Sequence, residues 1–207
     1  MLGNFSKNMK LCSVLIPTYH RTDMLSQAID SIFNNAHVKD RVEAVVRATD
    51  SDTDTIDLVT KLKDENPNII LVVGERRSGY NSLCEYHNEA FNASSGEWIW
   101  QFNDDVIVLT PAWDNALALW DQSNINVILT PELHRLGASG YKNDKGCPFF
   151  FQHRSHWEQM YDPACGAMSD YMAFGFAKKN NHQFKFLPIG VHHLRPTDAE
   201  IQRVRAL

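Results

Sequence analysis

The sequence has no cluster of basic residues and no long apolar run. Its 20 Lys and Arg residues are scattered among 25 Asp and Glu residues, and the net charge is −5. A surface that wraps nucleic acid needs concentrated positive charge, so we expect no such role. No apolar run approaches the roughly 20 residues of a membrane span, and residues 1–10 lack the apolar core of a secretory signal. We therefore expect a cytoplasmic protein.

Cysteine is also scarce, and the four cysteines follow no spacing of a zinc site or a disulfide framework. Scattered cysteines of this kind suit a reducing compartment. The composition, 43% hydrophobic and 22% charged, is typical of a globular protein. A chain of 207 residues is long enough for a complete core, so we expect one domain over residues 1–207.

The first half of the chain alternates apolar segments with amphipathic ones. Helices are predicted to begin at Thr22 or Asp23 and at Thr53 or Asp54, where a side chain can cap the first turn, and a third spans residues 81–93. This alternation predicts an α/β fold with a mostly parallel sheet, whose strands end at one common edge. The strands that precede these helices are predicted at residues 12–17, 43–48 and 69–73, and the first of them is expected to be buried.

The most informative segment is residues 97–108, EWIWQFNDDVIV. Its bulky apolar start predicts a buried strand, which stops on Asn103, Asp104 and Asp105 before apolar residues resume. Three oxygen-bearing side chains between two apolar runs are costly to bury unless something binds them. Mg²⁺ and Mn²⁺ prefer carboxylate oxygen and recruit substrate phosphates. We therefore predict a metal–diphosphate site here, with a tight turn as the alternative.

Polar residues also follow the other predicted strands. Residues 17–21 leave the first strand, and Asp50 and Asp52 leave the second, where capping by Thr53 or Asp54 leaves both acids unexplained. A solvated acidic loop is the alternative for those two acids. Because parallel strands end at the same edge, we expect these exits and the Asn-Asp-Asp run to meet in one cleft.

The loop at residues 74–80 carries two adjacent arginines, Arg76 and Arg77. Arginine binds oxyanions in a bidentate manner, so this loop could meet phosphate, although a solvated surface explains the arginines equally well.

The second half is less regular. A mobile loop is expected at residues 134–146, and His153 and His156 are interpreted as part of an ordinary helix start. The tail at residues 197–207 has no pattern that we can place. Strands are predicted at residues 127–130, 147–152 and 184–187, and helices at residues 111–120, 154–160 and 168–179.

Taken in order, these segments resemble the inverting glycosyltransferases of the GT-A fold, the large family 2 type. Asp114 also resembles an acid that often follows the central motif. The resemblance extends over about residues 12–120 and is looser beyond. Its motifs are residues 13–19 (SVLIPTY), 43–46 (EAVV), 78–81 (SGYN), 87–90 (HNEA) and 96–105 (GEWIWQFNDD).

The resemblance implies a GT-A, Rossmann-like, mostly parallel central sheet flanked by helices. Residues 12–110 would form a nucleotide-sugar-binding half and residues 111–196 an acceptor half. It further implies metal-dependent transfer of a hexosyl group, with inversion, from a UDP- or GDP-type nucleotide-diphospho-sugar to an unknown acceptor hydroxyl. The implied cofactor is Mn²⁺ or Mg²⁺.

The resemblance also implies site residues. Asp50 and Asp52 are rivals for a contact near the base, because the family places two acids where this chain has Ala48 and Thr49. Asn103 stands at an acidic position of the family motif and keeps an acceptor oxygen without the charge. The implied nucleotide-sugar contacts are Pro17, Thr18, Tyr19, Arg21, Asp50, Asp52, Gly79, Tyr80, Asn88, Asn103 and Asp104.

The implied metal ligands are Asp105 and a late histidine, His193. Its neighbour His192 would point to the other side of an extended segment, so only one of the two should be a ligand. The resemblance implies that Asp170 deprotonates the acceptor hydroxyl, with Glu158 and Asp162 in reserve. A favourable charge at a helix N-terminus is the alternative for Asp170.

Two other functions remain open. A nucleotidyltransferase shares this architecture, but residues 17–23 lack the glycine that such enzymes usually carry after the first strand. A non-catalytic nucleotide-binding or interaction protein is the other, because Asn103 and the altered exit of the second strand depart from the family motif.

Overall fold

The computed structural model describes residues 10–77, 82–120, 123–134, 149–157, 175 and 177–194. Within these residues, strands and helices alternate as far as β4, and the later elements are mostly strands. The elements are β1 (Cys12–Pro17), α1 (Thr22–Asn34), η1 (Lys39–Arg41), β2 (Val42–Thr49), α2 (Thr53–Glu65), β3 (Ile69–Gly74), α3 (Ser82–Asn92), β4 (Trp98–Gln101), β5 (Val106–Val108), α4 (Trp113–Ala118), β6 (Val127–His134), β7 (Phe151–His153), η2 (Arg154–His156) and β8 (Gln183–His193).

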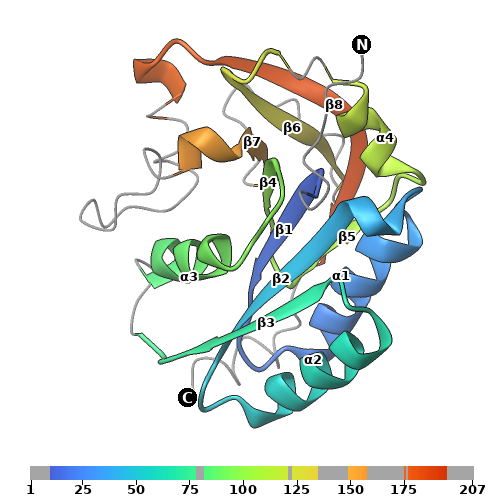
Figure 1. Cartoon of the computed structure of the whole chain (residues 1–207), viewed down its shortest axis with the longest axis vertical. Coiled ribbons are helices and arrows are strands. Elements are labelled where there is room, and N and C mark those ends of the chain that lie inside the picture. Colours follow the sequence, from blue (N-terminus) through green and yellow to red (C-terminus); the bar gives the residue numbers. More distant parts are fainter. Residues whose placement is uncertain are drawn as a thin grey trace.

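The strands form one eight-stranded sheet in the order β3-β2-β1-β4-β7-β6-β8-β5 (Figure 1). β1, β2, β3 and β4 are parallel to one another, and β6 is parallel to β8. β7 joins the two groups by antiparallel pairing with β4 and β6, and β5 is antiparallel to β8. The prediction of a mostly parallel α/β sheet is therefore confirmed.

Helices cover both faces of the sheet. α1 and α2 lie on one face and α3 on the other (Figure 1), and two apolar clusters fill the spaces between. Alternate residues of β4 serve the two clusters: Trp98 and Trp100 pack on the side of α1, and Ile99 packs on the side of α3. Burial on both faces explains why these strands are continuous apolar runs.

The acid run sits where β4 ends. Trp100 anchors this strand, because its ring stacks on Phe151 with 4.2 Å between centroids and lies 4.9 Å from the ring of Trp113. β5 resumes at Val106, so Asn103, Asp104 and Asp105 connect two buried strands at the carboxyl end of β4. Buried, packed residues on both sides therefore fix the position of the acids.

Several boundaries differ from the sequence-based predictions. α1 begins at Thr22 with Arg21 at the N-cap position and no side-chain cap, so neither Thr22 nor Asp23 caps it. α4 is limited to Trp113–Ala118. β8 is longer than predicted and includes the paired histidines, because its pairing with β5 extends that far.

β6 also continues beyond its predicted end. Its pairing with β8 shifts register between Thr130 and Glu132, around Pro131. Proline has no N–H to donate to a ladder, which accounts for the irregularity.

Candidate functional site

Asp104 and Asp105 are buried side by side, with 4% and 7% of their surfaces exposed. Asp104 accepts hydrogen bonds from Thr18 Oγ1 at 2.8 Å and from Arg21 Nη1 at 3.1 Å. The same Arg21 nitrogen lies 3.3 Å from Asp105 Oδ2. The predicted meeting of the first and fourth strand exits is therefore confirmed, and an ordinary exposed turn does not describe these acids.

The charges at this site are not balanced. Burial raises the pKa of Asp104 to about 6, Arg21 opposes that rise, and the neighbouring Asp105 adds to it. Among the described residues at this site, the single guanidinium of Arg21 therefore faces the two carboxylates of Asp104 and Asp105. A further positive charge at this place would be stabilised.

Asp105 is also close to His193. The Nε2 atom of His193 lies 3.3 Å from Asp105 Oδ2, and its ring packs edge-on against Phe149, with 5.3 Å between centroids. β5 and β8 pair antiparallel so that Val106 stands opposite His193, and Leu194 N donates to Asp105 O at 2.7 Å. Of the two histidines considered, His193 is the one that reaches the acids.

The side chains of Asp105 and His193 fit a divalent cation whose remaining ligands come from a bound substrate and from water. Asp105 Oδ1 is buried and has no hydrogen-bond partner among the described residues. Mg²⁺ and Mn²⁺ are commonly held by one or two carboxylates together with substrate phosphates and water. No group of three His, Cys, Asp or Glu residues within the described ranges is arranged to hold a metal alone. Asp105 and His193 therefore suit an incomplete protein shell.

Asp52 and Asp50 differ in their surroundings. Asp52 has no exposed surface and caps α2, accepting from Thr55 N at 3.2 Å and from His20 N at 2.6 Å. The expectation that capping by Thr53 or Asp54 would leave Asp52 unexplained was therefore wrong. Asp50 is exposed at the end of β2, where its backbone N–H donates to Gly74 O at 2.9 Å. Of the two rivals, Asp50 is the one with an exposed side chain.

Tyr19 lies beside a second arginine. The Arg76 guanidinium sits 4.2 Å above the Tyr19 ring centroid, and Arg76 Nη1 donates to the Tyr19 hydroxyl. β1 ends at Pro17, and Thr18 and Tyr19 follow it directly. Residues 17–19 and Arg76 therefore lie together at the carboxyl ends of β1 and β3.

The remaining predicted residues fall in different places. Asn88 lies on α3 and accepts from Trp157 Nε1 at 2.8 Å, and Asn103 is half-buried next to Asp104. Asp114 is fully buried and accepts from His37 N at 2.6 Å and from Val38 N at 3.1 Å. Asp114 thus ties the segment after α1 to α4. The predicted residues outside the described ranges are Gly79, Tyr80, Glu158, Asp162 and Asp170.

Arg47 was not among the site residues predicted from the sequence. This arginine is 1% exposed and pairs with Glu89 of α3 at 2.7 Å. An arginine inside an otherwise apolar predicted strand was the available signal, because arginine is rarely buried without a partner.

No helix in the described part of the chain combines the length and apolar character needed to cross a membrane. The predicted cytoplasmic location stays a prediction.

Three comparisons place these observations among known proteins. The model of the glycosyl transferase family 2 matches residues 13–181. No curated protein matches the chain. Among solved structures, TarS 1-349 of S. aureus in complex with UDP has a TM-score of 0.71 at 16% identity, over 90% of this chain and 61% of that one.

Two further structures are similar. The mannosyltransferase PcManGT of Pyrobaculum calidifontis, in complex with GDP-Man and Mn²⁺, has a TM-score of 0.73 at 17% identity, over 97% of this chain and 61% of that one. GalNAc-T7 with UDP, GalNAc and Mn²⁺ has a TM-score of 0.74 at 15% identity, over 94% and 45%. The chain thus spans less than two thirds of each of these proteins.

These likenesses establish the GT-A glycosyltransferase fold. The family match covers most of the chain and includes Thr18, Arg21 and the two acids, and it ends before His193. The chain belongs to glycosyl transferase family 2.

Proposed function

We propose that the chain transfers a hexosyl group from a nucleotide-diphospho-sugar to an acceptor hydroxyl, with inversion at the anomeric carbon and with Mn²⁺ or Mg²⁺. The observation that supports this most is the buried acid pair at the carboxyl end of β4, in contact with Arg21 and His193. This acid pair lies at the carboxyl end of a parallel strand, which is where ligands bind in open α/β sheets. The chain that carries it belongs to family 2.

In this proposal, Asp105 and His193 would hold the cation, together with the diphosphate of the donor. When bound there, such a cation would supply positive charge opposite the negative charge that develops on the leaving nucleoside diphosphate. Arg21 adds a second positive charge within hydrogen-bonding distance of both carboxylates. Thr18 orients Asp104 through its hydroxyl.

The donor is a UDP- or GDP-type nucleotide sugar. Structures of similar proteins contain UDP, UDP-GlcNAc or GDP-Man, which supports this class without choosing a base. We assign the contact near the base to Asp50, because its side chain is exposed, whereas Asp52 caps α2. The other proposed nucleotide-sugar contacts are Pro17, Thr18, Tyr19, Arg21, Gly79, Tyr80, Asn88, Asn103 and Asp104.

The chemical step requires a base on the opposite side of the sugar. The acceptor oxygen attacks the anomeric carbon while the bond from that carbon to the diphosphate oxygen breaks, and the electron pair of that bond stays on the diphosphate. Asp170, in the proposed acceptor half (residues 111–196), takes the acceptor proton. Glu158 and Asp162 are the reserve candidates for this base.

The proposal is tested by calorimetric titration of UDP and GDP into the protein with Mn²⁺ and with EDTA. We expect at least one nucleotide to bind only with Mn²⁺. Asp105→Asn should remove this dependence, and Asp57→Asn, which makes the same charge change on the exposed face of α2, should keep it. Failure of both nucleotides to bind the unaltered protein would refute the proposal.

Measurements of donor turnover then distinguish the proposed glycosyltransferase from a nucleotidyltransferase and from a non-catalytic binding protein. Hydrolysis or transfer of UDP-GlcNAc or GDP-Man that is lost in Asp105→Asn and in Asp170→Asn supports the proposed enzyme. Normal turnover in Asp170→Asn rejects that residue as the base. Pyrophosphate release from a nucleoside triphosphate would indicate a nucleotidyltransferase, and tight binding without turnover of any donor would indicate a binding protein.

A further inference from the structure

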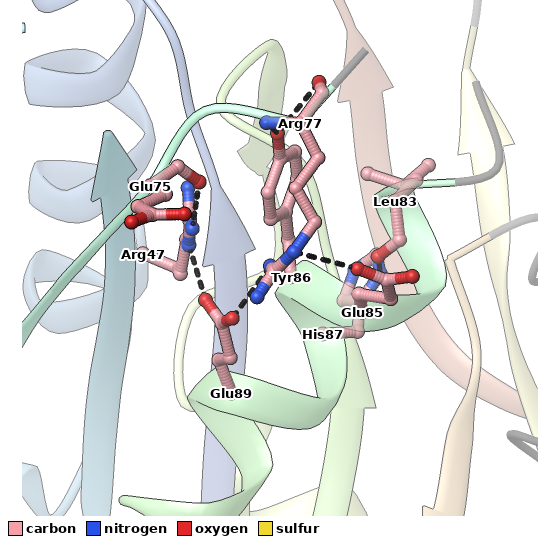
Figure 2. Close-up of polar contacts among 8 residues, drawn as sticks. All are labelled: Arg47, Glu75, Arg77, Leu83, Glu85, Tyr86, His87 and Glu89. Carbon is pink, nitrogen blue, oxygen red and sulfur yellow. Dashed lines mark hydrogen bonds and ion pairs between the residues drawn. The ribbon is translucent and has the colours of Figure 1, made fainter. Parts of the chain in front are cut away.

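A buried arginine lies on β2, which is separated by β1 from the strand that leads to the acid pair. Arg47, on β2, is 1% exposed, and its Nε donates to Glu89 Oε2 of α3 at 2.7 Å (Figure 2). Its Nη2 donates to Glu75 O at 2.7 Å, and its guanidinium lies 3.9 Å above the Tyr86 ring centroid. Burying a guanidinium is costly unless its partners are well placed, so this arrangement needs a reason.

A second arginine completes the network. Arg77 Nη1 lies 2.6 Å from Glu89 Oε1, so each oxygen of the Glu89 carboxylate faces a different guanidinium (Figure 2). The backbone of Arg77 is also held, because its N–H donates to the Tyr86 hydroxyl at 2.7 Å and its carbonyl accepts from that hydroxyl at 3.0 Å. Burial acts to raise the pKa of Glu89, but hydrogen bonds from Arg47 and Arg77 outweigh it and lower the pKa.

Gly74 leaves the space that this network occupies. A Cβ atom at Gly74 would lie 2.7 Å from Arg47 Nη2 and 3.0 Å from Glu89 Oε2. Both distances are too short for ordinary contact, so any side chain at the end of β3 would displace the guanidinium. The absence of a side chain at this position is therefore part of the same arrangement.

The network of Arg47, Glu89, Arg77 and Tyr86 holds the backbone of residues 75 and 77, on either side of Arg76. Glu75 is held by its carbonyl and Arg77 by its N–H and carbonyl, and the Arg76 guanidinium between them covers the Tyr19 ring. Arg47 O also accepts from Thr18 N at 3.1 Å, and Thr18 in turn donates to Asp104. Arg47 thus touches both the segment at residues 75–77 and the strand exit that reaches the acids.

We propose that Arg47, Glu89 and Arg77 are positioning residues that hold the Arg76–Tyr19 pair as the wall against which the nucleoside part of the donor rests. This inference rests on the proposed function. Arg76 and Tyr19 contact the nucleoside, and the three positioning residues act through them. Donor affinity should therefore depend on Glu89, whereas turnover at saturating donor should not.

The central variant is Glu89→Gln, with Glu85→Gln as the matched control. Glu85 also pairs with Arg77, at 2.8 Å, but the side chains of both residues of this pair are about 40% exposed. No ion pair or hydrogen bond joins Glu85 to Arg47 among the described residues. Exposed pairs contribute little. We expect Glu89→Gln to raise the KM for UDP-GlcNAc or GDP-Man by about tenfold, the loss expected for one charge-assisted hydrogen bond, with kcat unchanged. Glu85→Gln should leave both constants unchanged.

A second readout requires no nucleotide. Hydrogen exchange in the ligand-free protein should become about tenfold faster in peptides covering residues 75–77 of Glu89→Gln, and remain unchanged in Glu85→Gln. Arg77→Gln removes the exposed end of the network and should show the same acceleration, which keeps the inference testable if Glu89→Gln does not fold.

The outcomes separate the two proposals. Suppose that hydrogen exchange is faster in Glu89→Gln but the unaltered protein binds no nucleotide. This result would refute the proposed function and the nucleoside contact of Arg76 and Tyr19. It would still support the conclusion that the network holds residues 75–77. Nucleotide binding by the unaltered protein, together with equal KM and equal exchange in Glu89→Gln and Glu85→Gln, would overturn the inference alone. A fall in kcat with unchanged KM would also overturn it.

Discussion

Replacing Arg21 with glutamine tests how much the acid pair depends on positive charge. Arg21 Nη1 lies 3.1 Å from Asp104 and 3.3 Å from Asp105, and its side chain is 24% exposed. Removing one partner of a fully buried pair costs roughly 3–5 kcal/mol. Partial exposure of Arg21 reduces this value, so we expect Arg21→Gln to lose about 2–3 kcal/mol of unfolding free energy without metal.

A divalent cation should restore this loss if it binds the same carboxylates. Saturation to 100 times the dissociation constant stabilises a folded protein by about 2.7 kcal/mol. Because Arg21 competes with the cation for these oxygens in the absence of nucleotide, we expect Mn²⁺ to stabilise Arg21→Gln more than it stabilises the unaltered protein.

Urea unfolding followed by tryptophan fluorescence, with EDTA and with Mn²⁺, measures both effects. Arg41→Gln is the control, since Arg41 is exposed and the charge change is the same. Equal stability of Arg21→Gln and the unaltered protein in EDTA would refute the charge argument. An equal Mn²⁺ increment in both proteins would show that the cation does not share the carboxylates with Arg21.

Three further predictions follow from individual groups. Burial lowers the pKa of His87 from 6.5 to about 4, so the unfolded chain binds this proton first as the pH falls. The raised pKa of Asp104 acts in the opposite direction over the same range. In urea unfolding, the unaltered protein should therefore lose about 2 kcal/mol more stability between pH 7 and pH 5 than His87→Gln does. A Cβ at Gly96 would lie 2.4 Å from Ser13 N, so Gly96→Ala should cost about 1–3 kcal/mol in thermal unfolding, whereas Gly175→Ala, which meets nothing within 4 Å, should cost nothing. Asp52→Ala should lower stability by about 1 kcal/mol or more through loss of the α2 cap, whereas Asp50→Asn should weaken nucleotide binding in calorimetry and leave stability unchanged.

The convergence of the strand exits was predictable because parallel pairing fixes it. Once residues 12–17 and 98–102 are assigned to parallel strands, their carboxyl ends must lie at one edge. Thr18 and Asp104, which are 86 residues apart, therefore meet at 2.8 Å. The apolar runs at residues 12–17 and 98–101 were also correctly predicted to be buried strands, since strands buried on both faces show no alternation.

Features that depend on long-range pairing or on a choice among neighbouring side chains were not predictable. His193 reaches Asp105 because β8 pairs with β5 in one particular register, and a shift of one residue would present His192 instead. The cap of α2 was assigned to Thr53 or Asp54, but Asp52 takes it because His20 N and Thr55 converge on its carboxylate. Neither the register of β8 against β5 nor the choice of Asp52 as the cap can be read from the sequence pattern alone.

The charge balance of the site explains why Asn103 is compatible with it. Asp104 and Asp105 are already buried against one nearby guanidinium, and burial together with the neighbouring carboxylate raises the pKa of Asp104 despite that arginine. A third carboxylate at residue 103 would add negative charge without a described counter-charge, and would favour protonation of the acids before a cation bound. Asparagine keeps an oxygen acceptor and avoids that repulsion. The departure from the acidic motif therefore lowers the cost of the metal-free state, and it does not by itself indicate a lost active site.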